Sequence, residues 1–83
     1  MDRSQVYQIQ QTVVAIFARL AETTPDKIGP QDRFIGDLGF DSLKSMEALA
    51  RITDAFGIEP DIERMLKMQT VGEVIEQLVK HLS

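Results

Sequence analysis

The residues best placed for chemistry lie in the segment Gly39-Phe40-Asp41-Ser42-Leu43, where chain-breaking residues give way to a helical pattern. Ser42 offers a hydroxyl at this loop-to-helix junction, but serine hydrolysis needs a base beside the nucleophile and an acid that orients the base. The single histidine, His81, lies near the C-terminus, and no glycine follows Ser42 as a nucleophile elbow requires. We therefore expect Ser42 to be an attachment point on a protein that is not an enzyme.

The predicted helix start at Ser42 is suited to holding a phosphate group. The first turn of a helix has unpaired backbone N–H groups and lies at the positive end of the helix dipole, which would stabilise a phosphodiester on Ser42. Asp41 has two compatible interpretations: it caps the helix, or it ligates a metal ion that a modifying enzyme brings. The sequence contains neither a phosphate-binding glycine loop nor a cluster of metal-ligating residues, so we expect no resident metal.

A long amphipathic helix and a long loop precede this segment. Apolar residues recur at spacings of three and four, which predicts a helix from about residue 3 to about residue 21, with Asp2 and Gln5 as a capping pair. Residues 22–41 are rich in glycine and proline and predict a long loop, a feature that is often functional in a small domain. Four apolar residues should anchor this loop to the core: Ile28, Phe34, Ile35 and Leu38.

A second helix is expected to begin near Asp41 or Ser42 and to stop at Gly57. Its inward face should be formed by apolar residues at helical spacing: Leu43, Met46, Leu49, Ile52 and Phe56. A short helical segment is then predicted after Pro60, and it should include Ile62, Met65 and Leu66.

The last predicted helix opens with Thr70 and Glu73, which have the spacing of a capping box. Its inward face should again be apolar: Val71, Val74, Ile75, Leu78 and Leu82. Because no segment alternates as a strand does, the sequence predicts an all-α fold with three main helices and one short helix. We expect residues 1–83 to form a single domain.

Composition restricts the class of protein further. The 83 residues suffice for one modest core, and the apolar fraction of 43% is typical of a globular protein. The chain has no cysteine, hence no thiolate nucleophile or disulfide. The net charge is −4, with the acidic excess in residues 31–83, so we expect no binding to nucleic acid. With neither a signal peptide nor a membrane span in the sequence, we expect a cytoplasmic protein without membrane insertion.

The segment Asp37-Leu38-Gly39-Phe40-Asp41-Ser42-Leu43 resembles the D-L-G-x-D-S-L signature of acyl carrier proteins. The resemblance covers nearly the whole chain. It extends to the loop anchor Asp32-Arg33-Phe34, to Glu47, to Phe56-Gly57-Ile58 at the end of the second helix, and to Thr70-Val71. It implies a four-helix bundle of the acyl-carrier type, with the long loop between its first two helices.

The resemblance also implies a function. A phosphopantetheinyl transferase would attach 4'-phosphopantetheine covalently to Ser42, with Gly39, Asp41 and Leu43 completing the cofactor-binding segment. The thiol of the arm would carry acyl groups as thioesters to the acyl-transferring and chain-elongating synthases of fatty-acid, polyketide or other specialised lipid biosynthesis. The reactive sulfur then belongs to the cofactor and not to the protein. We expect a free-standing monomer.

The second helix departs from the strongly acidic pattern of fatty-acid carriers. Its candidate partner-binding residues have mixed charges: Lys44, Glu47, Arg51 and Asp54. Two interpretations are compatible. The spacings allow the surface ion pairs Lys44–Glu47 and Glu47–Arg51, each contributing roughly a few tenths of a kcal/mol. Alternatively, the charges retune the docking surface toward different partners, which would favour a specialised pathway.

The sequence leaves the role of the methionines and the nature of the cargo open. Met46, Met65 and Met68 are interpreted as core residues, or else as flexible thioethers lining a cleft that opens around an acyl chain. The protein could instead carry aminoacyl or peptidyl groups. It could also be an unmodified helical interaction module of the same fold. A helix-turn-helix DNA binder fits the number of helices but conflicts with the acidic charge.

Overall fold

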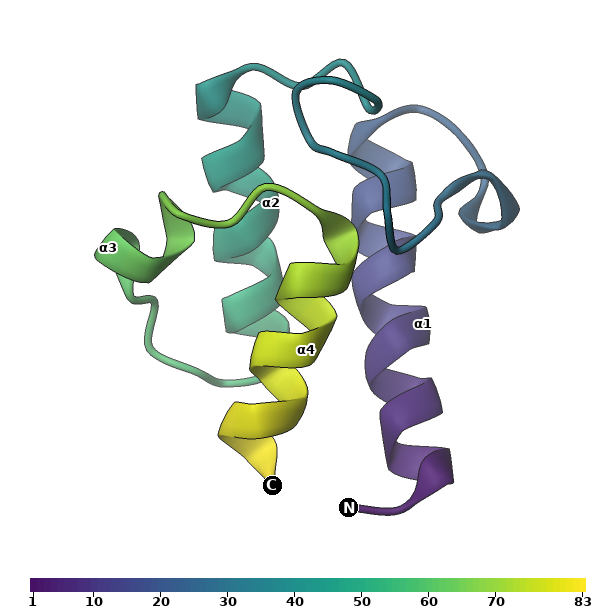
Figure 1. Ribbon diagram of the computed structural model, residues 1–83, viewed down its shortest axis with the longest axis vertical. Helices are drawn as coiled ribbons and strands as arrows, with labels where there is room; N and C mark the ends of the chain where they lie inside the picture. Colours follow the sequence, from purple (N-terminus) through teal and green to yellow (C-terminus); the bar gives the residue numbers. More distant parts are fainter.

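A computed structural model describes residues 1–83 and shows a helical bundle (Figure 1). The main helices are α1 (Arg3–Leu20), α2 (Ser42–Ala55) and α4 (Val71–Leu82), and α3 (Ile62–Met65) is the short one. A 3-10 turn, η1 (Pro25–Lys27), lies within the long loop. There is no strand, and no helix is both long and apolar enough to cross a membrane. The predicted all-α architecture is confirmed.

Local side-chain caps explain where the helices begin. Both predicted capping boxes are present, Asp2 with Gln5 at α1 and Thr70 with Glu73 at α4. Gly57, with φ of +65°, follows the C-terminal end of α2 as expected. Helix α1 ends at Leu20, one residue before the predicted boundary. Leu66 lies just after α3 and not within it.

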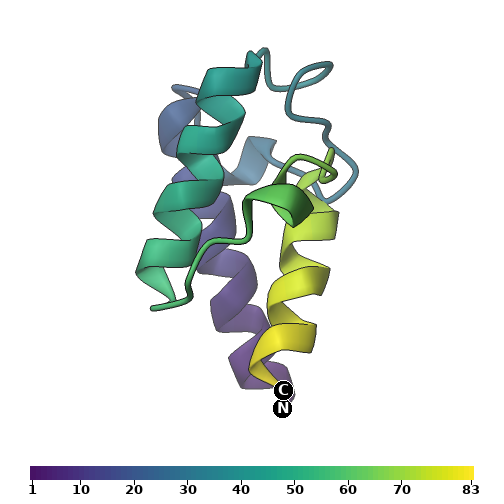
Figure 2. The same cartoon turned by 90° about the vertical axis from the view of Figure 1, so that its left-hand side faces the viewer.

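The helices are arranged so that the chain reaches Ser42 at one end of the bundle (Figures 1 and 2). Helix α1 runs antiparallel to both α2 and α4, and both chain termini lie at the same end. The loop between α1 and α2 crosses the opposite end before α2 begins. Ser42 therefore lies far from the termini, where the loop meets α2.

The core lies between the three main helices and takes in the long loop. Phe17 of α1 is fully buried and stacks on Phe34 and Phe40, with ring centroids 5.1 and 6.2 Å apart. These two loop phenylalanines fix the loop to the bundle because each buries a large apolar surface. The buried apolar residues are Ile9, Val13, Phe17, Ala18, Ile28, Phe34, Phe40, Ala48, Leu49, Ile52, Met65, Val71, Val74 and Leu78.

Three residues predicted to face inward are exposed instead. Leu43 is 80% exposed, Ile35 63% and Leu82 40%, so these predictions were wrong. The buried side of α2 is centred on Ser45, Ala48, Leu49 and Ile52. At about 100° of rotation per residue, Leu43 points roughly away from that centre. Apolar spacing alone did not reveal this, because an alanine and a serine occupy two of the inward positions.

Backbone hydrogen bonds join the long loop to the start of α4. Phe34 N–H donates to the carbonyl of Gln69 (2.9 Å), and Gly72 N–H donates to the carbonyl of Pro30 (2.8 Å). Arg33 and Thr70 form an isolated antiparallel bridge. These contacts fix the second half of the loop, which leads directly to Ser42.

Candidate functional site

Ser42 is the first residue of α2, and its side chain is exposed. The Lys44 amide donates to the Asp41 carboxylate (2.7 Å), and the Ser45 amide donates to the Asp41 carbonyl (3.0 Å). The amides of Ser42 and Leu43 donate to no protein acceptor. Two free N–H groups at the positive end of the helix dipole therefore lie beside the hydroxyl.

Asp41 and Gly39 set the geometry of the turn into α2. Asp41 is the N-cap, as expected, and its backbone is extended, which is the usual conformation of a residue directly before a helix. Gly39 adopts φ of +73°, in the left-handed region that residues with a Cβ rarely occupy. No atom lies within 4 Å of the position that a Cβ would take. The glycine is therefore required by the backbone conformation and not by crowding.

The charged residues of α2 interact differently from the prediction in one respect. Glu47 and Arg51 form the expected ion pair, at 3.0 Å. Lys44 does not pair with Glu47; its ammonium lies over the Phe40 ring, 5.7 Å from the centroid. A helical side chain leans toward the N-terminus of its helix, which takes Lys44 back to this aromatic face. Asp54 is exposed and forms no ion pair.

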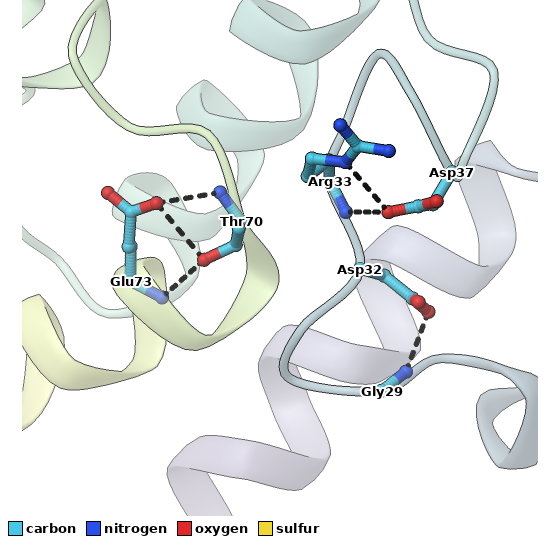
Figure 3. Close-up of polar contacts among 6 residues, drawn as sticks. All are labelled: Gly29, Asp32, Arg33, Asp37, Thr70 and Glu73. Atoms are coloured by element: carbon cyan, nitrogen blue, oxygen red, sulfur yellow. Dashed lines mark hydrogen bonds and ion pairs between the residues drawn. The ribbon is translucent and has the colours of Figure 1, made fainter.

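A turn closed by Arg33 and Asp37 precedes the segment from Gly39 to Leu43 (Figure 3). The Asp37 carboxylate accepts hydrogen bonds from the Arg33 backbone N–H (2.8 Å) and from Nε (3.2 Å). These bonds lower the pKa of Asp37, the backbone bond contributing most and the side-chain bond next. A carboxylate held in its charged form by these bonds is a poor general acid at neutral pH, and Asp41 is engaged as a cap. The two aspartates thus have structural roles in this fold.

A groove of about 440 Å³ adjoins Ser42. It lies between the loop at residues 33–36, the start of α2 and the segment after α3. The residues that line it are Arg33, Phe34, Ile35, Gly36, Ser42, Ser45, Met46, Leu66, Met68 and Gln69. An exposed hydroxyl, two free amides and an adjoining groove with apolar and hydrogen-bonding walls fit a phosphate-linked arm on Ser42.

A second cavity, of about 300 Å³, lies between α2, α3 and α4. Met65 and Met68 line it together with Leu49, Ile52, Ile58, Val74 and Leu78. Met65 is buried while Met46 and Met68 are half-buried against the core, so the methionines both pack in the core and line hollows. His81 is exposed at the edge of this cavity, as its position near the C-terminus suggested.

Three exposed apolar residues lie near Ser42, and the sequence pattern did not indicate this surface. Leu66 is 69% exposed, in addition to Leu43 and Ile35. Ile35 and Leu66 line the groove with Ser42, and Leu43 follows Ser42 directly. Exposed apolar side chains that gather around one polar side chain are typical of a surface that other proteins contact. The spacing of the apolar residues had placed Leu43 on the inward face of α2, so it gave no signal of this exposed surface.

No arrangement for catalysis surrounds Ser42. Its neighbours include no histidine, and no group of three or more His, Cys, Asp or Glu side chains lies close enough together to hold a metal ion. The arrangement instead presents a hydroxyl to other molecules. The fold and the site together define a carrier, a helical domain that displays a group for other proteins to modify and use.

Comparison with known proteins identifies the family. The family described as phosphopantetheine attachment site matches residues 11–78. The acyl carrier protein of Rickettsia bellii (strain RML369-C) is 31% identical over 80 residues, covering 96% of this chain and 93% of that protein. The acyl carrier protein of Thermosynechococcus vestitus is 35% identical over 69 residues, covering 83% and 85%. The chain belongs to the acyl carrier protein family.

Solved structures support the same fold. A protein of Mycobacterium tuberculosis assigned as an acyl carrier protein aligns with a TM-score of 0.77 and 27% identity, covering 86% of this chain and 95% of that one. BlmI, a type-II acyl carrier protein of Streptomyces verticillus involved in bleomycin biosynthesis, aligns with a TM-score of 0.81, covering 98% and 94%. At 22% identity, this second likeness concerns the fold alone.

Membership of this family defines the activity. The protein is a carrier and not an enzyme, and its cofactor is 4'-phosphopantetheine. The thiol of that group supplies the thioester chemistry when it is attached, while the protein supplies the attachment point and the surface that other enzymes contact. Carrier proteins of this kind interact with synthases and transferases.

Proposed function

We propose that Ser42 bears the 4'-phosphopantetheine arm, in one carrier domain formed by residues 1–83. The observation that carries this proposal is the exposed Ser42 hydroxyl at the first position of α2, beside amides that no protein acceptor engages. A phosphopantetheinyl transferase would join the arm to Ser42 Oγ. The hydroxyl loses its proton, a phosphorus–oxygen bond forms, and the nucleotide part of coenzyme A leaves. Gly39, Asp41 and Leu43 shape the segment that the transferase contacts.

Intact mass spectrometry after incubation with coenzyme A and a broad-specificity phosphopantetheinyl transferase tests this assignment. We expect the mass to rise by one phosphopantetheine group, and the Ser42→Ala variant to show no rise. Ser45→Ala is the matched control, because Ser45 lines the same groove but is buried and bonded to the Asp41 carbonyl at 2.9 Å. No gain in the natural sequence, or a gain that persists in Ser42→Ala, would leave an unmodified interaction module as the better description.

The surface around Ser42 is proposed to dock the transferase and the partner synthases. Lys44, Glu47, Arg51 and Asp54 supply its charges, and Leu43 supplies an exposed apolar contact. Mixed charges on this helix fit partners whose surfaces carry the complementary mixture, and like charges brought face to face exclude the wrong partners. Lys44 contacts the Phe40 ring and Arg51 forms an ion pair with Glu47. Both cations are therefore held in place before a partner binds.

The cavity between α2, α3 and α4 supports an aliphatic acyl cargo for fatty-acid, polyketide or other specialised lipid biosynthesis. Seven of its 13 lining residues are hydrophobic, and these include Met65 and Met68. Aliphatic chains gain free energy by contact with these apolar residues. Loading the holo protein with a medium-length saturated acyl group should raise the melting temperature more than loading it with an aminoacyl group. Equal effects would favour aminoacyl or peptidyl carriage.

We further propose that the domain acts as a monomer in the cytoplasm. The acidic net charge of −4 opposes self-association at neutral pH. Sedimentation equilibrium should report the mass of one chain, and a dimer mass would contradict the proposal.

A further inference from the structure

The groove beside Ser42 contains a single charged side chain. Arg33 lines it, and every other lining residue is apolar or uncharged. Lys44 lies only two residues after Ser42, but it does not line the groove, and its ammonium lies over the Phe40 ring. The cation that shares a hollow with the Ser42 hydroxyl is therefore Arg33.

Local contacts hold Arg33 in a defined position. Its backbone N–H and its Nε both donate to Asp37 (Figure 3). The backbone N–H of its neighbour Phe34 donates to the carbonyl of Gln69. A Cβ on Gly36 would lie 2.9 Å from Arg33 Cζ, so the guanidinium lies directly against the glycine backbone. The guanidinium is thus oriented by three features of this loop before any ligand is present, which reduces the entropy lost on binding.

The contacts within the loop use only part of the guanidinium. Asp37 accepts from Nε, while the two terminal nitrogens of Arg33 have no hydrogen-bond partner in the protein. The side chain is 63% exposed. An exposed ion pair with Asp37 contributes little to stability. The terminal N–H groups remain available, and their planar fork suits two oxygens of one phosphate.

We propose that the terminal nitrogens of Arg33 bind the phosphodiester on Ser42. This inference rests on Ser42 being the attachment residue, as proposed above. Arg33 then acts as a positioning residue for the arm, because the contact draws the phosphate end of the arm toward the loop at residues 33–36. The free amides of Ser42 and Leu43 would bind on the helix side of the same phosphate. Asp37 supports the contact by fixing Nε.

Nuclear magnetic resonance of the loaded protein tests this contact without any activity measurement. Mass spectrometry first establishes that Ser42 carries the arm; a chain that is not loaded there refutes the proposed function itself. In the loaded natural sequence, we expect the side-chain ¹⁵N and N–H resonances of Arg33 to shift from their positions in the unloaded protein. Unchanged Arg33 resonances in a fully loaded chain would overturn this inference alone.

The ³¹P resonance of the phosphodiester provides the second readout. Arg33→Gln should shift it, and Arg33→Lys, which keeps the charge but loses the planar fork, should shift it less. Lys44→Gln is the matched control, because it removes one positive charge near Ser42 from outside the groove. A ³¹P resonance that Arg33→Gln leaves in place, or that Lys44→Gln moves as far, would overturn the proposal. Far-UV circular dichroism checks that each variant is folded.

Discussion

The contribution of Asp41 to α2 can be separated into a hydrogen bond and a charge. Its carboxylate accepts one bond, from Lys44 N–H at 2.7 Å, and it lies at the positive end of the helix dipole. Loss of an N-cap side chain costs about 1 kcal/mol, and loss of a charge at this position costs about 0.5 kcal/mol. Asp41→Ala should therefore lower the free energy of unfolding by about 1.5 kcal/mol. Asp41→Asn keeps an acceptor and should lower it by only about 0.5 kcal/mol.

Thermal unfolding followed by circular dichroism measures the difference. For a domain of this size, the two losses correspond to falls in melting temperature of about 6–12 °C and about 2–4 °C. Asp54→Ala is the control, because it removes the same charge from the same helix without a cap or an ion pair. It should leave the melting temperature unchanged or raise it slightly, because Asp54 lies near the negative end of the helix dipole. Equal destabilisation by alanine and asparagine at position 41 would refute the capping argument.

The same variants address the second interpretation of Asp41. An amide is a weaker ligand for a hard cation than a carboxylate, so we expect a transferase to load Asp41→Asn more slowly although the variant is well folded. Loading at the natural rate would show that the aspartate serves the helix alone.

Two further predictions concern the loop that leads to Ser42. Gly72→Ala should destabilise the protein by about 1–3 kcal/mol despite alanine's higher helix propensity, because its Cβ would lie 2.8 Å from the Pro30 carbonyl oxygen. Urea unfolding tests this, with Gly29→Ala, which meets only the flexible Gln31 side chain, as the near-neutral control. The lowered pKa of Asp37 stabilises the fold at neutral pH, and this contribution is lost as the pH falls below about 4 through the folded-state pKa. The difference in the free energy of unfolding between the natural sequence and Asp37→Asn should therefore shrink as the pH falls. A difference that stays constant from neutral to acid pH, measured by urea unfolding, would contradict the argument.

The helix boundaries could be predicted because their signals are local. Asp2 with Gln5, Thr70 with Glu73, and Gly57 act within one turn of chain, so their positions in the sequence determine where helices begin and end. The same is true of Asp41 and of the exposed serine that follows it. This is why the start of α2 and its exposed serine could be located before the fold was known.

Contacts between distant segments could not be predicted in the same way. The loop joins α4 through Arg33 and Thr70, which lie far apart in the sequence. The exposure of Leu43 depends on which side of α2 faces its neighbours, and apolar spacing alone does not determine this. The sequence spacing favoured Glu47 as the partner of Lys44, whereas in the structure the Lys44 ammonium lies over the Phe40 ring. The groove at Ser42 combines three such segments, and no local pattern indicated it.

The central claim is that Ser42 carries the arm in the living cell. The most direct measurement is tandem mass spectrometry of peptides from the protein recovered from its native cells. We predict a phosphopantetheine group on the peptide that contains Gly39 to Leu43, with fragment ions that place it on Ser42. Recovery of the protein wholly without the group, or with the group on another residue, would contradict the account.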